Sequence, residues 1–132
     1  YWRGQDYLGL GTGAWGTVTL PSGRLRYRNS PSPERYQASD FAEPFSDHVC
    51  AVLEPLDAET SLRERIMLGL RLAEGFDLEA AAAALGVEPY PSSRRRALDN
   101  LSQRGQLQQR GSRLVVPKSQ WLLADGIISE LL

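Results

Sequence analysis

The chain has 132 residues, of which 42% are hydrophobic and 23% are charged, and this composition predicts a folded protein rather than a disordered one. Fifteen basic and sixteen acidic residues give a formal net charge of −1, so no overall field draws the molecule to nucleic acid or to an anionic membrane. One cysteine, no leader at the start and no apolar run long enough to span a bilayer lead us to expect a cytoplasmic protein.

The first half of the sequence predicts short strands joined by glycine and proline turns. Residues 7–10 indicate a short buried strand that runs into Gly9, Gly11 and Gly13. Residues 16–28 alternate between apolar and polar side chains around Pro21-Ser22-Gly23, which predicts a β-hairpin with a three-residue turn. A short helix is expected over residues 33–39, and residues 40–56 are expected to be a mixed connecting segment.

The second half predicts helices with clear start and stop signals. Ser61 and Glu64 form a capping box for a first helix that ends at Gly75. Its apolar face consists of Leu62, Ile66, Leu70 and Ala73. Asp77 is expected to cap a second helix that stops at Gly86. The buried side of that helix comprises Leu78, Ala82 and Leu85.

Further elements follow toward the C-terminus. A third helix over residues 92–104 is expected to bury Ala97, Leu98 and Leu101 and to stop at Gly105. Residues 106–110 and 113–116 then predict a two-stranded wing around Gly111-Ser112. The tail over residues 119–132 predicts a final packed helix with Trp121, Leu122, Ile127, Ile128 and Leu131. Three helices followed by a two-stranded wing are typical of a winged-helix domain.

Basic residues stand at the start of the third predicted helix. In a winged-helix domain this helix enters the DNA major groove, and Arg94, Arg95 and Arg96 are candidates for phosphate contacts. Residues 57–132 nevertheless carry equal numbers of acidic and basic residues, so we expect no DNA binding and place these arginines against another domain or solvent. A stand-alone regulatory module that binds DNA or a partner protein is the alternative function.

His48 and Cys50 are the only candidates for soft metal ligands in the sequence. A metal or haem site needs further ligands and a supporting second shell of hydrogen bonds. We therefore expect His48 to be a surface or hydrogen-bonded residue and Cys50 to be a small buried hydrophobe. The sequence predicts neither a catalytic residue nor a metal site in this chain.

Several segments, in one order, resemble a known family. They are Tyr1-Trp2, the run Tyr-Leu-Gly-Leu-Gly-Thr-Gly-Ala-Trp over residues 7–15, Arg-Tyr-Arg-Asn over 26–29, Met-Leu-Gly-Leu-Arg over 67–71 and Gly-Phe-Asp over 75–77. Together they are similar to the C-terminal part of the oxygen-independent coproporphyrinogen III oxidase-like radical S-adenosylmethionine (SAM) family, which includes the HemW-type proteins.

The resemblance implies an α+β fold in two parts. Residues 1–56 would supply the closing strand, β-hairpin and linker of an incomplete (β/α) barrel, and residues 57–132 a small winged-helix-like domain. The partner of this chain would be its own missing N-terminal barrel. In the family, Tyr-Trp closes a motif opened by a His-Asn pair, which would lie just before Tyr1.

The resemblance also implies cofactors of the parent protein, namely a [4Fe–4S] cluster held by three cysteines, S-adenosylmethionine and, in HemW-type relatives, haem. One cysteine cannot hold that cluster, so we expect this chain to be inactive alone. The parent would act in porphyrin or haem metabolism, either as an oxidase or as a haem chaperone, and the sequence leaves both open.

Candidate site residues follow from the resemblance. Gly9, Gly11, Gly13 and Ala14 would contact the cofactor, and the needs of a tight strand end, which are compatible with such contact, also explain the glycines. Tyr1, Trp2, Arg26, Arg28 and Asn29 would contact a porphyrin or haem, since guanidinium groups pair well with propionate carboxylates; as hairpin residues, Arg26, Arg28 and Asn29 are equally explained as bystanders. The sequence departs from the family at Trp15, where many members have histidine, and at Pro117 and Gln120.

Overall fold

The computed structural model describes residues 2–38, 45 and 50–132, and these residues divide into two compact units. The first unit lies within Gln5–Asp57, and the second combines Trp2–Gly4 with Ala58–Leu132. Both helices and antiparallel strands are present, so the predicted α+β class is confirmed. Among the described residues, no helix is both long and apolar enough to cross a membrane.

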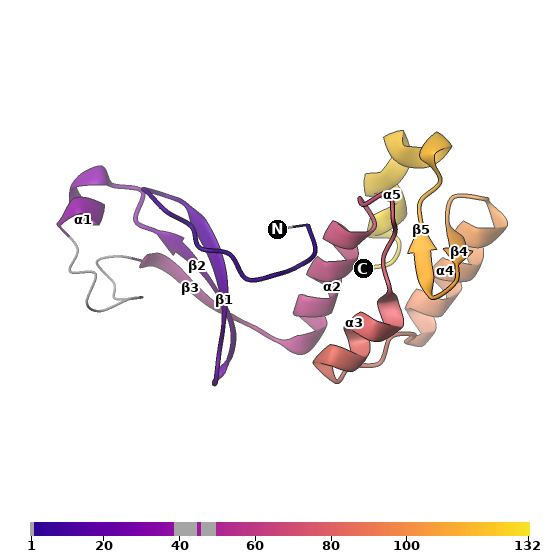
Figure 1. Ribbon diagram of the computed structural model, residues 1–132, viewed down its shortest axis with the longest axis horizontal. Helices are drawn as coiled ribbons and strands as arrows, with labels where there is room; N and C mark the ends of the chain where they lie inside the picture. The colour runs from indigo at the N-terminus through magenta and orange to yellow at the C-terminus, as the bar shows by residue number, and fades with distance from the viewer. Residues whose placement is uncertain (1, 39–44, 46–49) are drawn as a thin grey trace. The chain divides into compact units, whose positions relative to one another are not determined.

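The first unit is built on a three-stranded antiparallel sheet in the order β1-β2-β3 (Figure 1). Its strands are β1 (Trp15–Leu20), β2 (Gly23–Asn29) and β3 (Cys50–Leu56). The predicted hairpin is confirmed, but Leu20 pairs directly with Gly23, so the turn contains two residues instead of three. Helix α1 (Pro33–Gln37) follows β2, and the Ser32 side chain caps it by accepting a hydrogen bond from the Arg35 amide.

Two predictions for the first unit are wrong. Residues 7–10 are not a buried strand, because only Tyr7 pairs with β1, at Thr17, and the two leucines of this segment are exposed. Residues 50–56 of the expected connecting segment form strand β3. The sequence pattern does not predict this strand, because most of its side chains are exposed and Pro55 has no amide hydrogen to donate. Residues 39–44 and 46–49 of that segment lie outside the described residues.

The second unit confirms the predicted order of three helices, a two-stranded hairpin and a closing helical segment. It contains α2 (Ala58–Gly69), α3 (Leu78–Leu85), α4 (Ser92–Gln103), β4 (Gln108–Arg110), β5 (Arg113–Val115), η1 (Lys118–Leu123) and α5 (Ala124–Ser129). In Figure 1 the β4–β5 hairpin lies beside α4. Asp77 caps α3 by accepting from the Ala80 amide, and Gly86 and Gly105 end α3 and α4 in left-handed conformations.

The ends of two predicted helices need correction. Helix α2 begins at Ala58, so Ser61 is a buried residue of its second turn and not its cap. It also ends at Gly69 and not at Gly75, and Ala73 lies beyond the helix and is exposed. The predicted final helix is broken into η1 and α5, and Trp121 and Leu122 of η1 are exposed rather than packed.

One apolar core holds the second unit together. It joins α2, α3, α4, the hairpin and α5 through Leu62, Ile66, Leu70, Leu78, Ala82, Leu101, Leu107, Val116, Ile127, Ile128 and Leu131. The first unit has a much smaller core of Tyr27 and Cys50, against which Val18 and Phe45 pack. The difference is consistent with a first unit that buries little apolar surface by itself.

Candidate functional site

Three side chains hold the glycine-rich segment in the first unit. The Gly9 amide donates to the Tyr27 hydroxyl at 2.9 Å, and the Gly11 amide donates to the Tyr36 hydroxyl at 3.1 Å. The Asn29 amide group donates to the carbonyls of Gly9 and Gly11 at 3.0 and 2.8 Å. We call Tyr27, Asn29 and Tyr36 the loop clamp. The backbone groups of Gly9 and Gly11 bond to these side chains and not to the backbone of a neighbouring strand. Residues 8–10 therefore do not join the sheet.

The fold explains each glycine in this segment. A Cβ atom on Gly9 would lie 2.2 Å from the carbonyl oxygen of Trp15, which no side chain tolerates. Gly11 and Gly13 have φ angles of +96° and +68°, which favour glycine. Apart from its two chain neighbours, no described residue has a heavy atom within 4 Å of a Cβ built on Gly11. The glycines are thus required by the backbone, and the space beside Gly11 is open.

Ala14 continues the same turn into β1. Its carbonyl accepts from the Asn29 backbone amide at 2.9 Å, and the Gly13 amide donates to the Ser30 carbonyl at 2.9 Å. The four predicted cofactor residues therefore form one turn that is tied to the end of β2 by backbone and side-chain hydrogen bonds.

Arg24, Arg26 and Arg28 of β2 share one face of the sheet with Trp15, and the last two contact its ring. The register pairs Trp15 with Arg28 and Thr17 with Arg26, so the side chains of these rows point to the same side. The guanidinium carbons of Arg26 and Arg28 lie 6.0 and 5.7 Å from the centre of the Trp15 ring, within the range of a cation–π contact.

The two guanidinium groups differ in their charge partners. Arg26 donates to one carboxylate oxygen of Glu54 through Nε at 3.0 Å and Nη2 at 2.7 Å, so its charge is neutralised. Arg28 donates to the Gly13 carbonyl at 3.4 Å and has no carboxylate partner among the residues that the structure describes. Of these two guanidinium groups, Arg28 is therefore the one that a carboxylate of the described residues does not neutralise.

The other predicted substrate residues lie elsewhere. Asn29 is 3% exposed, and its side-chain amide is occupied by the glycine segment. Trp2 belongs to the second unit, whereas Arg26, Arg28 and Asn29 belong to the first. Tyr1 lies outside the described residues. The structure thus brings Arg28 close to the glycine turn, places Arg26 beside Trp15 and Glu54, and places Trp2 in a separate unit.

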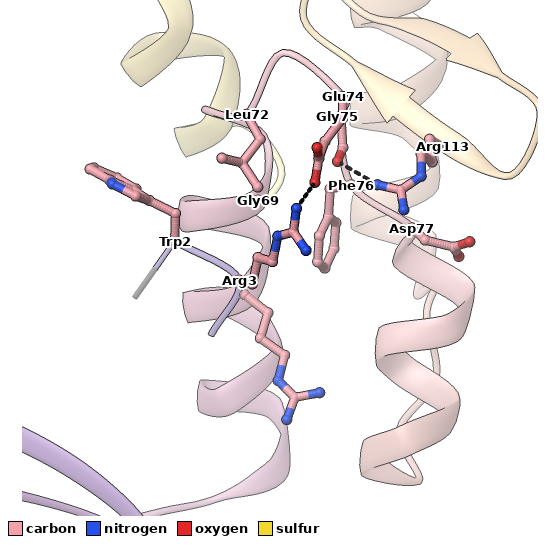
Figure 2. A pocket seen from close by; sticks show the side chains of 10 residues that line it. Trp2, Arg3, Gly69, Leu72, Glu74, Gly75, Phe76, Asp77 and Arg113 are labelled. Atoms are coloured by element: carbon pink, nitrogen blue, oxygen red, sulfur yellow. Dashed lines mark hydrogen bonds and ion pairs between the residues drawn. The ribbon is translucent and has the colours of Figure 1, made fainter. Parts of the chain in front are cut away.

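Trp2 lines a pocket of about 200 Å³ in the second unit (Figure 2). Its other lining residues are Arg3, Arg65, Gly69, Leu72, Glu74, Gly75, Phe76, Asp77 and Arg113. Arg3 pairs with Glu74 at 3.2 Å, and Arg113 donates to the Gly75 carbonyl at 3.1 Å. In Figure 2 the Trp2 indole points away from Phe76 and Arg113. The cations of this pocket are already engaged by groups of the protein.

The β4–β5 hairpin of the second unit holds Phe76 and Asp77, two of the residues that line this pocket. Phe76 and Leu114 exchange two backbone hydrogen bonds, of 2.8 and 2.9 Å. The Asp77 carboxylate accepts from the Ser112 hydroxyl at 2.6 Å, and this hydrogen bond, with that from the Ala80 amide, holds the pKa of Asp77 below its ordinary value. The carboxylate therefore acts as a helix cap and hairpin tie.

Arg94 is buried, contrary to the expectation that it faces another domain or solvent. Its guanidinium donates to the carbonyls of Leu131 at 3.0 Å and Pro89 at 3.2 Å and to the Glu59 carboxylate at 2.6 Å. Burial raises the pKa of Glu59, but the hydrogen bonds from Arg94 and Arg63 outweigh it and keep that pKa below its ordinary value. Arg94 thus joins α4 to α2 and the C-terminus and is not presented to a phosphate.

Of the candidate soft ligands, only Cys50 is described by the structure. It is buried, and burial raises the pKa of its thiol. No group of three potential metal ligands occurs among the described residues, and His48 lies outside them. A [4Fe–4S] cluster that requires three cysteine thiolates does not fit a sequence with one.

The loop clamp and the Arg94 contacts could not be found from local sequence patterns. Tyr36 and Gly11 are 25 residues apart, and Arg94 and Leu131 are 37 apart. One signal was present, because the hairpin register places Gly16 opposite Tyr27. Gly16 leaves room for the Tyr27 ring, which a Gly16 side chain would meet at 2.3 Å, and the ring crosses it to reach Gly9.

The comparisons with known proteins point to one family. The model of the HemN C-terminal domain matches residues 56–123, just over half of the chain. No curated protein sequence matches this chain. The solved structure of coproporphyrinogen III oxidase (HemN) from Escherichia coli, described as a radical SAM enzyme, matches with a TM-score of 0.67 at 16% identity.

That match covers 96% of this chain and 28% of the HemN chain. At this identity the likeness shows the fold, and the chain spans well under a third of the HemN length. The family match over more than half of the residues nevertheless shows that this chain belongs to the HemN C-terminal domain family.

Proposed function

We propose that this chain is the C-terminal part of a cytoplasmic radical SAM protein of porphyrin or haem metabolism. Residues 1–56 close the end of its barrel, and residues 57–132 form a winged-helix-like accessory domain. The observation that carries the proposal is the fold match over 96% of this chain to a chain of which it covers 28%. The family match over residues 56–123 supports it independently.

In this proposal the chain contributes no catalytic group of its own. The cluster and S-adenosylmethionine supply the radical chemistry, and their ligands lie in the part of the protein outside this chain. The glycine turn of residues 9–14 supplies a fixed backbone surface at the cofactor end of the barrel. The open space beside Gly11 and the rigid hold of the loop clamp support this role.

Arg28 is the residue that we propose for the substrate carboxylates. A porphyrin carries planar propionate groups, and a guanidinium group pairs with such an anion in a bidentate arrangement. The cation–π contact with Trp15 holds Arg28 near that ring, and the described residues offer it no competing carboxylate. Arg26 is held by Glu54, so its role is to support Trp15 and Arg28 from the neighbouring row.

The test uses the product of the whole reading frame that encodes this chain. We expect an Arg28→Gln variant to bind coproporphyrin III at least tenfold more weakly, because the loss of one charge-assisted hydrogen bond costs about 1.5–3 kcal/mol. Arg63→Gln is the matched control, since Arg63 is an exposed arginine of α2 paired with Glu59. Absorbance titration measures both dissociation constants.

The same protein distinguishes the two possible activities. Decarboxylation of coproporphyrinogen would identify an oxidase, and tight haem binding without decarboxylation would identify a chaperone. Equal porphyrin binding by the wild type and Arg28→Gln would remove Arg28 from the substrate site. A reading frame without a three-cysteine motif upstream of Tyr1 would contradict the proposed function as a whole.

A further inference from the structure

A larger pocket, of about 500 Å³, lies in the second unit between helix α4 and the β4–β5 hairpin. Its lining residues on α4 are three, four and seven positions apart and so share one face of the helix: Arg95, Leu98, Asp99 and Ser102. On the hairpin, Gln109 and Leu114 are opposite each other in the register, so their side chains point to the same side. We call this pocket the hairpin groove.

Two leucines give the hairpin groove an apolar wall. Leu98 and Leu114 are partly buried, and both pack against the apolar core of the second unit. Apolar atoms that cover these side chains leave water, which favours binding. A ligand that fits the hairpin groove therefore has an apolar part.

Two carboxylates line the groove without a cationic partner. Glu79, in the first turn of α3, accepts a hydrogen bond from the Tyr90 hydroxyl at 2.9 Å. Burial and this hydrogen bond raise the pKa of Tyr90, so its hydroxyl stays protonated and leaves the charge of Glu79 in place. Neither Glu79 nor Asp99 forms an ion pair with an arginine or lysine of the described residues.

Arg95 is the only cation among the described residues that line the groove. Its guanidinium carbon lies 5.7 Å from the centre of the Tyr90 ring, within the range of a cation–π contact. The hairpin arginines, Arg110 and Arg113, alternate with the lining residues and therefore point to the opposite face of the hairpin. Two carboxylates and one guanidinium thus make the groove acidic.

We propose that the hairpin groove binds a lysine or arginine side chain in an extended segment of a partner protein. The aliphatic stem of that side chain lies on Leu98 and Leu114, and its cationic end meets the carboxylates of Glu79 and Asp99. A nucleic acid does not fit, because its phosphates would meet the same two carboxylates.

The length of the groove favours a peptide segment over a free amine. Its face on α4 runs from Arg95 to Ser102, which is about 10 Å along the helix axis. About three residues of extended chain have this length. The groove therefore has room for the residues on either side of the basic one. The inference does not depend on the proposed function, since it uses residues of the second unit alone.

A peptide titration of the isolated chain, followed by the NMR signals of the Leu98 and Leu114 methyl groups, tests the proposal. The probe is acetyl-Ala-Leu-Lys-Leu-Ala-amide, for which we expect a Kd on the order of 0.1–1 mM at low salt. A second probe carries norleucine in place of lysine, which keeps the aliphatic stem and lacks the charge. It should bind at least tenfold more weakly, because it makes no charge-assisted hydrogen bond.

A pair of double variants locates the charges that matter. Glu79→Gln with Asp99→Asn should weaken the lysine peptide at least tenfold and leave the norleucine peptide unaffected, because the variant keeps the shape of both side chains. The matched control is Glu34→Gln with Asp125→Asn, which changes the net charge equally at two exposed carboxylates of α1 and α5. The control should change the Kd by less than about twofold.

Several results would overturn the inference. These are no binding of the lysine peptide, equal binding of the two peptides, or undiminished binding by the Glu79→Gln, Asp99→Asn variant. Inorganic phosphate that binds in the groove more tightly than the lysine peptide would make it an anion site. A groove that is already filled in the product of the whole reading frame, and closed there to the peptide, would make a segment of the same protein the occupant.

Discussion

Gly16 and Tyr27 face each other across the β1–β2 hairpin, and their pairing determines where the glycine segment lies. The Tyr27 ring crosses β1 only because Gly16 has no side chain. Its hydroxyl then accepts the Gly9 amide. The absence of a side chain at Gly16 therefore determines where the backbone turn at Gly9 lies.

A Gly16→Ala substitution tests this dependence. The added methyl group would overlap the Tyr27 ring at 2.3 Å, so the ring must move and release the Gly9 amide. We expect the free energy of unfolding of the first unit to fall by about 1–3 kcal/mol in urea titrations. Gly126→Ala on α5, where the methyl group meets no atom within 4 Å, should be neutral or slightly stabilising. Equal effects of the two variants would refute the account.

Arg94 shows how one buried cation can be mistaken for a surface residue. It stands in a run of three arginines, yet it is 3% exposed and bonded to three groups of the second unit, whereas Arg95 and Arg96 are exposed. Adjacent helical residues point in different directions. A run of like charges therefore does not place all its members on one face.

Replacing Arg94 by methionine should destabilise the second unit. The change removes the donor from the carbonyls of Leu131 and Pro89, and it leaves the Glu59 carboxylate with its hydrogen bond from Arg63 alone. We expect a loss of about 3 kcal/mol in the free energy of unfolding, measured by circular dichroism in urea. Arg96→Met, at an exposed position of the same helix, should change it by less than about 0.5 kcal/mol. Indistinguishable variants would show that the buried contacts contribute little.

At the scale of elements, local sequence signals predicted helix caps and stops but not the features that depend on contacts between distant residues. The Asp77 cap and the stops at Gly86 and Gly105 depend on residues close in sequence, and all three are present. The hairpin is present as well, although its turn has two residues instead of three. Strand β3 has no clear alternation, because it pairs with β2 through its backbone while exposing most side chains. Helix α2 ends at Gly69, where the Phe76 ring leaves no room for a side chain, and this contact between residues of different segments is outside the capping rules.

The candidate site likewise has parts that the local sequence predicts and parts that depend on the folded chain. The sequence predicted the glycine turn and the arginines of β2, since both lie in short recognisable runs. The loop clamp joins residues 18 to 25 positions apart, so it depends on the hairpin register and on α1. Such contacts exist only once the chain has folded.

Helix α4 should not bind duplex DNA. Specific binders commonly neutralise on the order of 6–10 phosphates, and burial of Arg94 leaves Arg95 and Arg96 as the exposed arginines of the predicted cluster. Asp99 on the same helix is exposed and repels phosphate. A fluorescence anisotropy titration of the isolated chain at low salt should show no tight binding. Tight, salt-sensitive binding that is lost in an Arg95→Ala, Arg96→Ala variant would contradict this.

At the scale of the whole molecule, the chain combines a large core in the second unit with a small one in the first. The first unit also exposes Leu8, Leu10, Trp15 and Leu53. This imbalance is expected of a segment whose remaining apolar contacts are made by another part of a larger protein. Belonging to the HemN C-terminal domain family is consistent with that arrangement.

The iron and sulfide content after anaerobic reconstitution tests the central claim most directly. The claim is that the cluster belongs to the parent protein and not to this chain, because Cys50 is the one cysteine in 132 residues. The product of the whole reading frame should bind one [4Fe–4S] cluster and cleave S-adenosylmethionine, and the isolated chain should do neither. A whole product without iron and sulfide, or an isolated chain that binds them stoichiometrically, would contradict the account.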